Sequence, residues 1–290
     1  MELWFAFAMV VVFLWGSDGI LAKLSTPRLG VVRIAALMVI VDGITYSLGF
    51  YYWRENLPIS LGDGVLAVVS CMVGTVAYLF FFESMMDGQV AIVATISAAY
   101  PALTVIGALV FLSETLTVTQ AMALVAIIGG VVALSYERNP GGKHAMPRRS
   151  LLFALLAFAL WGVWGLTSKM AINAIGPGNI LGFYVISSLT VPPVYAWFRR
   201  VRPGLPGDVD PSRMAWALGV TALAVNVCGL FAFSFALNAG FASLVVPISS
   251  AYPLVTVILA VALLHEKLDR FHMFALVFVI IGLIVIGVTG

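Results

Sequence analysis

Long apolar runs fill most of the chain, and short polar segments that contain glycine, proline, lysine and arginine separate them. An α-helix needs roughly 20 apolar residues to cross the hydrocarbon core of a bilayer, and these runs have that length. The strands of a transmembrane barrel would instead give short segments in which apolar and polar residues alternate. Ten helical spans fit the sequence, at about 3–23, 30–52, 64–84, 90–111, 118–136, 151–171, 178–198, 213–236, 242–263 and 270–288.

The composition excludes an ordinary soluble domain. Hydrophobic residues make up 62% of the chain and charged residues 10%, with a mean hydropathy of +1.09. Soluble domains are about 45–50% apolar and about 25% charged. We therefore predict an all-α integral membrane protein embedded in the lipid bilayer. The net charge of +2 does not indicate a nucleic-acid partner, because the basic residues lie in the loops between spans.

The segment from Ile96 to Gly130 returns near the C-terminus as the segment from Ile248 to Gly282. The residues that match without a gap are Ser97, Tyr100, Pro101, Thr104, Val105 and Glu114 in the first segment and Ser249, Tyr252, Pro253, Thr256, Val257 and Glu266 in the second. The two halves also begin alike, each with a Trp-Gly pair. Such a self-match indicates duplication. We expect a first repeat over residues 1–136, a linker over 137–150 and a second repeat over 151–290.

Lysine and arginine gather in the loops after spans one, five, seven and nine. Because cytoplasmic loops carry the excess of positive charge, we expect these loops in the cytoplasm and both termini outside, in the inner (plasma) membrane of a bacterium or archaeon. Each copy holds five spans, an odd number, so the second copy enters the membrane upside down. Inverted repeats are typical of secondary transporters, whose substrate site lies near mid-membrane where the copies meet.

A Tyr-Pro pair lies near the middle of spans four and nine. Proline removes one backbone donor and crowds the carbonyl four residues earlier, so Pro101 and Pro253 predict kinks that could act as hinges. The polar residues on one helical face are Ser97, Tyr100 and Thr104 in span four and Ser249, Tyr252 and Thr256 in span nine. We predict that these two faces line a central substrate cavity. The alternative is a packed kink whose hydroxyl groups bond back to their own helix.

Tryptophan occurs at mid-depth in the first span of each copy. Trp15, Trp161 and Trp164 lie there, although tryptophan normally prefers the membrane interfaces. They are candidates to line the cavity and to bind a flat or apolar part of the substrate. The alternative is packing against the adjacent glycines. Tyr78 and Asn226 are two further polar candidates for the cavity at membrane depth.

Three carboxylates fall inside predicted spans, at Asp18, Asp42 and Glu83. An intramembrane carboxylate is costly, so each is a candidate to couple transport to another process, such as proton movement. The alternative is a structural ion pair, for which Lys23 and Arg33 are the nearest basic residues to the ends of these spans.

Two pairs of matched residues predict structural roles. Glu114 and Glu266 close spans four and nine, and we expect each to cap the start of the helix that follows. The small residues of spans five and ten, which favour close approach of helices, are Gly129, Gly130, Gly282 and Gly287.

Several chemical signatures are missing from the sequence. It contains no phosphate-binding glycine loop, no metal-spaced cluster of histidine or cysteine and no nucleophile motif. We therefore expect neither an enzyme nor a protein that needs a cofactor or metal, and we expect no ATP-driven pumping by this chain.

The chain resembles the drug/metabolite transporter superfamily, and within it the EamA-type members, which include the YddG-like exporters of aromatic amino acids. The residues that carry the resemblance are Trp15, Gly16 and Lys23 with Trp161, Gly162 and Lys169, and the Ser-Tyr-Pro-Glu sets of spans four and nine. It implies a basket-shaped bundle with spans one, three, four, six, eight and nine around a central cavity and spans five and ten at the periphery. Phosphate-carrying relatives need basic residues in the cavity; here only Lys169 lies well within a span, which favours amino acids or apolar metabolites.

We therefore expect a secondary transporter that exports a small-molecule substrate, most readily an aromatic or neutral amino acid, by alternating access. Proton-coupled efflux of cationic drugs is the alternative within the same class. A non-transporting membrane scaffold or a lipid-handling enzyme is the alternative of another class. The sequence is compatible with a monomer or a homodimer.

Overall fold

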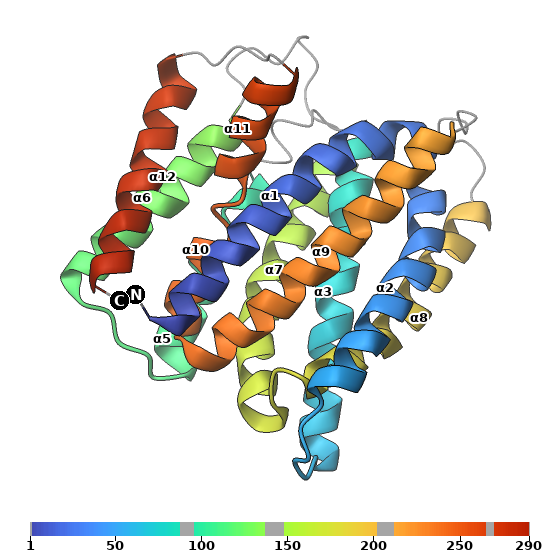
Figure 1. Cartoon of the computed structure of the whole chain (residues 1–290), viewed down its shortest axis with the longest axis horizontal. Coiled ribbons are helices and arrows are strands. Elements are labelled where there is room, and N and C mark those ends of the chain that lie inside the picture. Colours follow the sequence, from blue (N-terminus) through green and yellow to red (C-terminus); the bar gives the residue numbers. More distant parts are fainter. Residues whose placement is uncertain (1, 88–95, 137–147, 202–211, 265–269, 290) are drawn as a thin grey trace.

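The computed structural model describes residues 2–87, 96–136, 148–201, 212–264 and 270–289 of the 290-residue chain. Within these ranges every regular element is helical, which confirms the predicted all-α membrane fold (Figure 1). The helices are α1 (Leu3–Leu29), α2 (Val31–Trp53), α3 (Leu61–Asp87), α5 (Tyr100–Phe111), α6 (Val118–Ser135), α7 (Arg148–Ile175), α8 (Asn179–Val201), α9 (Arg213–Ala239), α10 (Ala242–Ser249), α11 (Pro253–Leu264) and α12 (Arg270–Thr289).

The lengths of the helices suit a bilayer. In the described part of the chain, nine helical segments are long and apolar enough to cross a membrane, and Ile96–Phe111 forms a shorter apolar helix. The first residues of the predicted fourth span, and most of the predicted linker over 137–150, lie outside the described residues. Helix α7 begins at Arg148, within the predicted linker.

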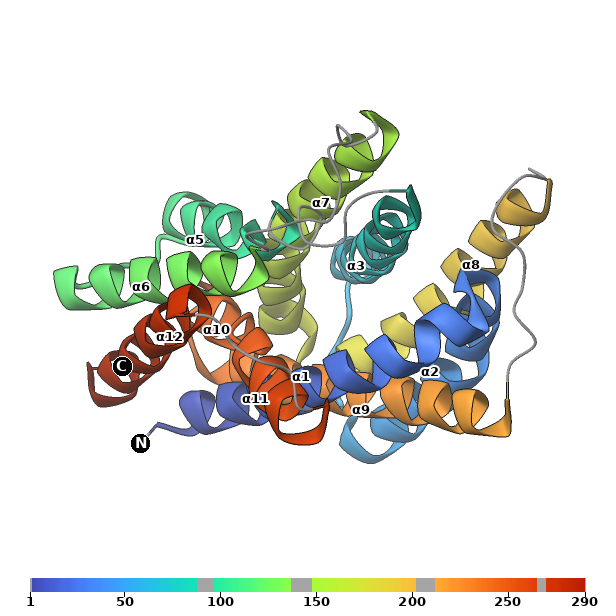
Figure 2. The same ribbon diagram turned by 90° about the horizontal axis from the view of Figure 1, so that it is seen from above.

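The helices of the two halves interlock instead of forming separate bundles. Helix α1 packs along α9. Helix α7, which is the equivalent of α1 in the second half, packs along α3. In the same way α1 contacts α11 while α7 contacts α5. Each first helix therefore packs against the third and fourth helices of the other half, which is the arrangement that inverted repeats produce. The remaining equivalent helices of the two halves pack against each other: α6 packs on α12 at one end of the molecule, and α2 packs on α8 at the other (Figures 1 and 2).

At each predicted kink a turn interrupts the helix. Helix α10 ends at Ser249 and α11 begins at Pro253, while α5 begins at Tyr100 with Pro101 in its first turn. A single tight turn bridges each break, where the backbone N–H of Ala251 donates to the Ile248 carbonyl at 2.9 Å. The matching N–H of Ala99 donates to the Ile96 carbonyl at 3.3 Å. These bonds satisfy backbone groups that hydrocarbon could not satisfy.

Mirrored glycines bring α6 and α12 into close contact. A Cβ atom on Gly130 would lie 2.6 Å from Cγ2 of Val279, and one on Gly282 would lie 2.6 Å from Cγ1 of Ile127. Neither position has room for a side chain. Gly129 differs, because a Cβ there would meet no atom within 4 Å. The predicted packing role therefore belongs to Gly130 and Gly282, and also to Gly287, where a Cβ would lie 2.9 Å from Cζ of Phe5 on α1.

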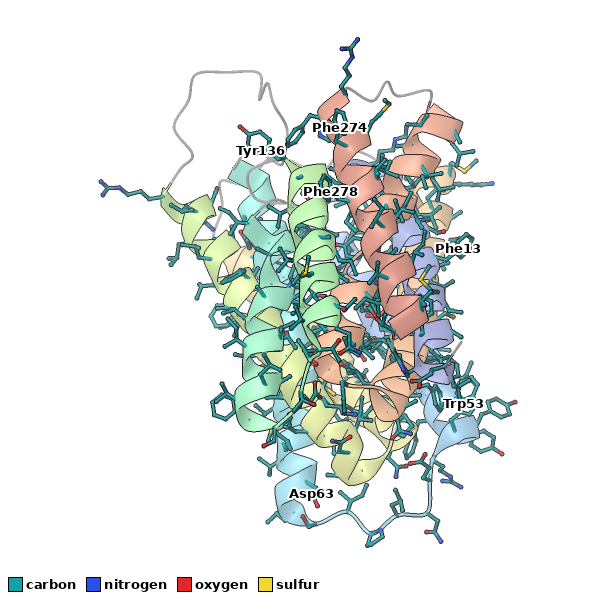
Figure 3. The ribbon with its side chains drawn as sticks, turned by 90° about the vertical axis from the view of Figure 1, so that its left-hand side faces the viewer. Phe13, Trp53, Asp63, Tyr136, Phe274 and Phe278 are labelled. Carbon is teal, nitrogen blue, oxygen red and sulfur yellow. The ribbon has the colours of Figure 1, made fainter. Side chains whose placement is uncertain are left out.

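The outer surface carries the apolar side chains. Phe274 and Phe278 on α12 point away from the bundle (Figure 3), and they are 67% and 56% exposed. At the end of α2, Tyr51, Tyr52 and Trp53 form an exposed aromatic group. An apolar exterior with aromatic residues at a helix end is what a membrane protein presents to the lipid and to the interface.

The glycine contacts predict a sharp difference between two adjacent substitutions. Gly130→Ala should destabilise the protein by about 1–3 kcal/mol, because the added methyl group overpacks the contact with α12. Gly129→Ala should be neutral or stabilising by up to about 1 kcal/mol, because alanine favours the helix and meets open space. Thermal unfolding in the same detergent compares the two variants. Equal midpoints would contradict the proposed packing.

Candidate functional site

Two threonines join the halves at symmetrical points. Thr104 donates its hydroxyl to the Gly162 carbonyl, and Thr256 donates to the Gly16 carbonyl, each at 2.9 Å. The close approach needs the glycine, since a Cβ on Gly16 would lie 2.8 Å from the Tyr252 carbonyl oxygen. The hydroxyl groups that we predicted to line a cavity thus tie the helices that follow the breaks to the first helix of the other half. Thr256 also donates to the Tyr252 carbonyl of its own span at 3.3 Å, as the alternative expected, but bonding to the other half was not among the alternatives drawn from the sequence.

An aromatic group surrounds Trp161. The ring of Tyr100 lies 5.7 Å from the Trp161 ring, and that of Phe81 lies 5.3 Å away. The Tyr78 ring follows at 6.5 Å. Tyr100 is buried, whereas Tyr78 and Trp161 keep part of their surface accessible.

A matching group surrounds Trp15 on α1. Tyr252 meets its ring edge-on at 6.3 Å, and Phe233 lies 5.3 Å away. The indole N–H of Trp15 donates to the Asn226 backbone carbonyl at 3.2 Å. Trp15, Asn226 and Tyr252 are half-buried, so each keeps part of its surface accessible.

Trp164 packs in the wall between helices. It is 6% exposed, its indole N–H donates to the Tyr184 hydroxyl at 2.8 Å, and its ring stacks on Phe233. It also covers Gly74, where a Cβ would lie 2.6 Å from Cδ1 of the indole. These contacts favour the packing alternative for this tryptophan.

The two aspartates converge from different helices. The Asn226 side-chain amide on α9 donates to Oδ2 of Asp18 on α1 at 2.8 Å. An electrostatic interaction joins Asp18 to Asp42 on α2, and Tyr78 interacts with both. Asp42 is 6% exposed, and its Oδ1 atom has no hydrogen-bond partner among the described residues. The structure thus brings two buried carboxyl groups within electrostatic range of each other, which the sequence presented only as separate candidates.

The matched serines Ser97 and Ser249 are buried beside the two breaks. In the part of the chain that the structure describes, the hydroxyl of each has no hydrogen-bond partner. The predicted bonding of these hydroxyls back to their own helix is therefore not seen there.

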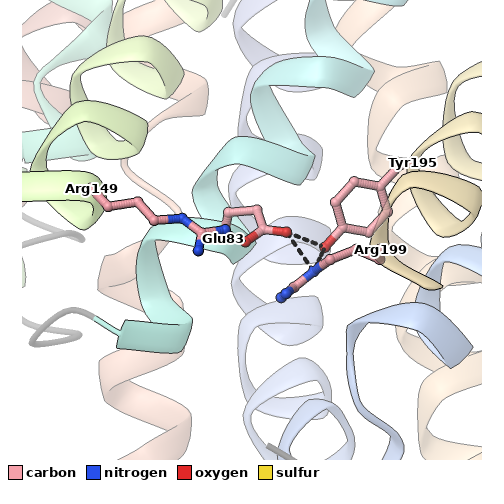
Figure 4. Close-up of polar contacts among 4 residues, drawn as sticks. All are labelled: Glu83, Arg149, Tyr195 and Arg199. Carbon is pink, nitrogen blue, oxygen red and sulfur yellow. Dashed lines mark hydrogen bonds and ion pairs between the residues drawn. The ribbon is translucent and has the colours of Figure 1, made fainter. Parts of the chain in front are cut away.

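Glu83 belongs to a network that joins three helices at the end of the bundle opposite the two termini (Figure 4). Its carboxylate forms ion pairs with Arg199 on α8 and, at 3.4 Å, with Arg149 on α7. The Tyr195 hydroxyl donates to the same carboxylate at 2.9 Å and accepts from Nε of Arg199 at 3.1 Å. The sequence had pointed to Lys23 and Arg33, because Arg149 and Arg199 seemed to lie in loops; both helices extend far enough to reach Glu83.

Lys169 and Glu114 hold the turn between α9 and α10. The Lys169 ammonium group donates to the carbonyl oxygens of Leu237 and Gly240. Glu114 accepts from the backbone N–H groups of Ala242 and Ser243, each at 2.8 Å. A carboxylate at a helix N-terminus satisfies free donors and complements the helix dipole.

The predicted cap by Glu114 on the following helix was wrong. Thr117 and Gln120 form a reciprocal capping box at the start of α6, and Glu114 reaches α10 in the other half instead. Its match, Glu266, lies outside the described residues. Among the described residues, no three His, Cys, Asp or Glu side chains gather as metal ligands would.

Interlocked halves, broken helices at their junction and charged groups at membrane depth are features that many multi-pass membrane transporters share. Residues 2–136 and 148–288 both match the EamA-like transporter family, and the chain belongs to that family, within the drug/metabolite transporter superfamily. Members of this family are transporters, not enzymes.

The chain is also similar to individual proteins. A protein known from its crystal structure superposes with a TM-score of 0.77 over 99% of this chain and 96% of its own, at 16% identity, which shows a shared fold. An uncharacterised protein of Methanocaldococcus jannaschii is 35% identical over 69 residues, which are 24% of this chain. The chain matches about half the length of that relative, 50%.

The Glu83 network predicts unequal effects for its two arginines. Arg199→Gln should destabilise the protein by about 3–5 kcal/mol, because it leaves the buried carboxylate without its closest cation. Arg149→Gln should cost less than about 1 kcal/mol, since the Arg149 side chain is 50% exposed. Thermal unfolding in detergent measures both. If Glu83→Gln in the Arg199→Gln background lowers stability further instead of restoring part of it, the ion pair is not what holds these helices.

Proposed function

We propose that the protein is a secondary transporter that exports small metabolites, with aromatic or neutral amino acids as substrates, by alternating access across the inner membrane. The observation that carries this proposal is the pair of mirrored helix breaks beside the two aromatic groups. Irregular backbone at membrane depth is tolerated where it is buried in protein or lines a water-filled cavity. In inverted-repeat transporters the substrate binds at such breaks.

In this proposal the half-buried side chains around the breaks line the substrate cavity. They are Trp15, Tyr78, Trp161, Asn226 and Tyr252. Their rings suit a flat or apolar portion of a substrate, and the amide and hydroxyl groups suit its polar portion. The buried residues Ser97, Tyr100 and Ser249 would support these side chains from behind.

The loop charges suggest how the chain sits in the membrane. The Glu83 network lies at the end of the bundle that carries Arg149 and Arg199, opposite the termini. Because positive residues concentrate on the cytoplasmic side, this end faces the cytoplasm and both termini face outward. Export then begins from the end of the bundle that holds this network.

Proton-coupled efflux of cationic compounds is the second candidate. Asp18 and Asp42 support it, because both carboxylates are buried at membrane depth, where ionisable residues mark substrate or proton pathways. Glu83 supports it less, because its carboxylate is already paired with arginine.

Flux into proteoliposomes tests the function directly. Purified protein is reconstituted, and uptake of radiolabelled tryptophan, phenylalanine and threonine is measured with and without a pH gradient. Saturable amino-acid flux without a gradient supports a facilitative exporter. Flux of cationic compounds that needs the gradient supports the second candidate instead. Absence of any saturable flux for either group would argue against both.

The helix breaks predict that proline matters for turnover more than for binding. Pro253→Ala permits α10 and α11 to join into one helix, which should stiffen the hinge. We expect turnover to fall about tenfold, equivalent to about 1.4 kcal/mol on the barrier, with substrate affinity nearly unchanged. Pro193→Ala, in the uninterrupted helix α8, is the control. A loss of affinity at constant turnover would refute the hinge.

A further inference from the structure

The duplication provides an internal control for the site. The halves share the threonine ties and the aromatic groups around Trp15 and Trp161. Where a contact between the halves occurs at both equivalent positions, that contact serves the common fold. A contact present at only one of the two positions points to a task that the fold itself does not require.

The pair Asp18–Asn226 is such a difference. In the register that matches Trp15 with Trp161 and Tyr100 with Tyr252, Asp18 corresponds to Trp164, and Asn226 corresponds to Gly74. Where α7 of the second half packs on α3 of the first, the Trp164 ring covers Gly74 and fills the space between the helices. At the equivalent place between α1 and α9, a carboxylate and an amide meet at 2.8 Å. The fold can therefore be built with an apolar contact here, and the α1–α9 contact departs from it.

Asp42 supplies a second buried carboxyl group within electrostatic range of the first. It interacts with Asp18 through space, and its Oδ1 atom is buried without a partner among the described residues. A buried carboxylate without a partner is costly, and two nearby carboxylates repel each other. Both costs fall when a cation with several N–H donors lies between them.

The surroundings suit an organic cation. Tyr78 interacts with both carboxylates, and Tyr252 interacts with Asp18. The Trp15 ring lies next to Tyr252 and is held by Asn226, the same residue that binds Asp18. Aromatic faces beside carboxylates attract ammonium groups through cation–π contact and also bind the apolar part of an amine.

We propose that Asp18 and Asp42 form the subsite that recognises the protonated amino group of the transported molecule, with Asn226 positioning Asp18 and with Trp15 and Tyr252 beside the apolar portion. The proposal rests on the transport function proposed above and specifies its substrates as primary amines, including amino acids. The ammonium group is the required feature, and a carboxylate on the substrate is not.

Three compounds with one phenyl ring separate these features. Phenethylamine has the ammonium group, phenylalanine has both charged groups, and 3-phenylpropionate has the carboxylate alone. Isothermal titration calorimetry on the purified protein in detergent measures the affinity for each. We expect phenethylamine and phenylalanine to bind and 3-phenylpropionate to bind at least about tenfold more weakly, since one good charged contact contributes at least that factor.

Matched variants test the carboxylates. Asp42→Asn should weaken phenethylamine binding on the order of thirty-fold, because the cation loses a buried charged partner. Asp18→Asn should act in the same direction and serves if Asp42→Asn does not fold. Asp63→Asn removes the same charge at the start of α3, away from the bundle interior (Figure 3), and should leave the affinity unchanged.

Three results would overturn the subsite. One is equal affinity for 3-phenylpropionate and phenethylamine. Another is an Asp42→Asn variant that folds and binds phenethylamine as tightly as Asp63→Asn. The third is loss of pH-driven flux in Asp42→Asn with amine affinity unchanged, which would assign the carboxylates to a proton.

The two proposals fail in different ways. Amine binding that depends on Asp42, without flux of any compound in proteoliposomes, would remove the transport function and keep the subsite. Phenylalanine flux that phenethylamine does not inhibit would keep the transport function and remove the subsite.

Discussion

Hydrocarbon offers no hydrogen bonds to a backbone, so a chain that crosses a bilayer can leave the regular helix only where other protein groups satisfy it. In this protein the departures occur at two matched places, the turns before Pro101 and Pro253. Both turns close on their own backbone, and the helix after each turn is tied to the opposite half by a threonine. The irregular backbone is therefore located where the halves meet, which is also where a substrate site can form.

The interlocking of the halves follows from small residues. Helices in a membrane gain little from the hydrophobic effect between them, so close packing and interhelical hydrogen bonds carry more of the association. Gly16 and Gly162 admit the opposite helix, and their carbonyl groups accept the threonine hydroxyls. Gly130 and Gly282 likewise allow α6 and α12 to approach each other closely. One packing solution thus appears twice, because the duplicated sequence carries it twice.

Charge breaks this symmetry. The buried carboxylates Asp18, Asp42 and Glu83 all belong to the first half. Of these, Glu83 forms ion pairs with arginines of the second half. Lys169 in the second half is engaged with the carbonyl oxygens at the end of α9. The symmetrical contacts build the scaffold, and of the asymmetrical charges only Asp18 and Asp42 belong to the proposed amine subsite.

The sequence by itself determined the all-α membrane class, the duplication and the location of the helix breaks, because bilayer thickness, apolar length and proline act on local segments. It also identified Asp18, Asp42 and Asn226 as separate polar residues at depth. Only the tertiary structure decided which of them meet. Partner choice depends on the rotation and register of helices distant in sequence, which an apolar run leaves unspecified. For the same reason Arg199 emerged as the partner of Glu83, and Trp164 as a packing residue, only once the helices were assembled.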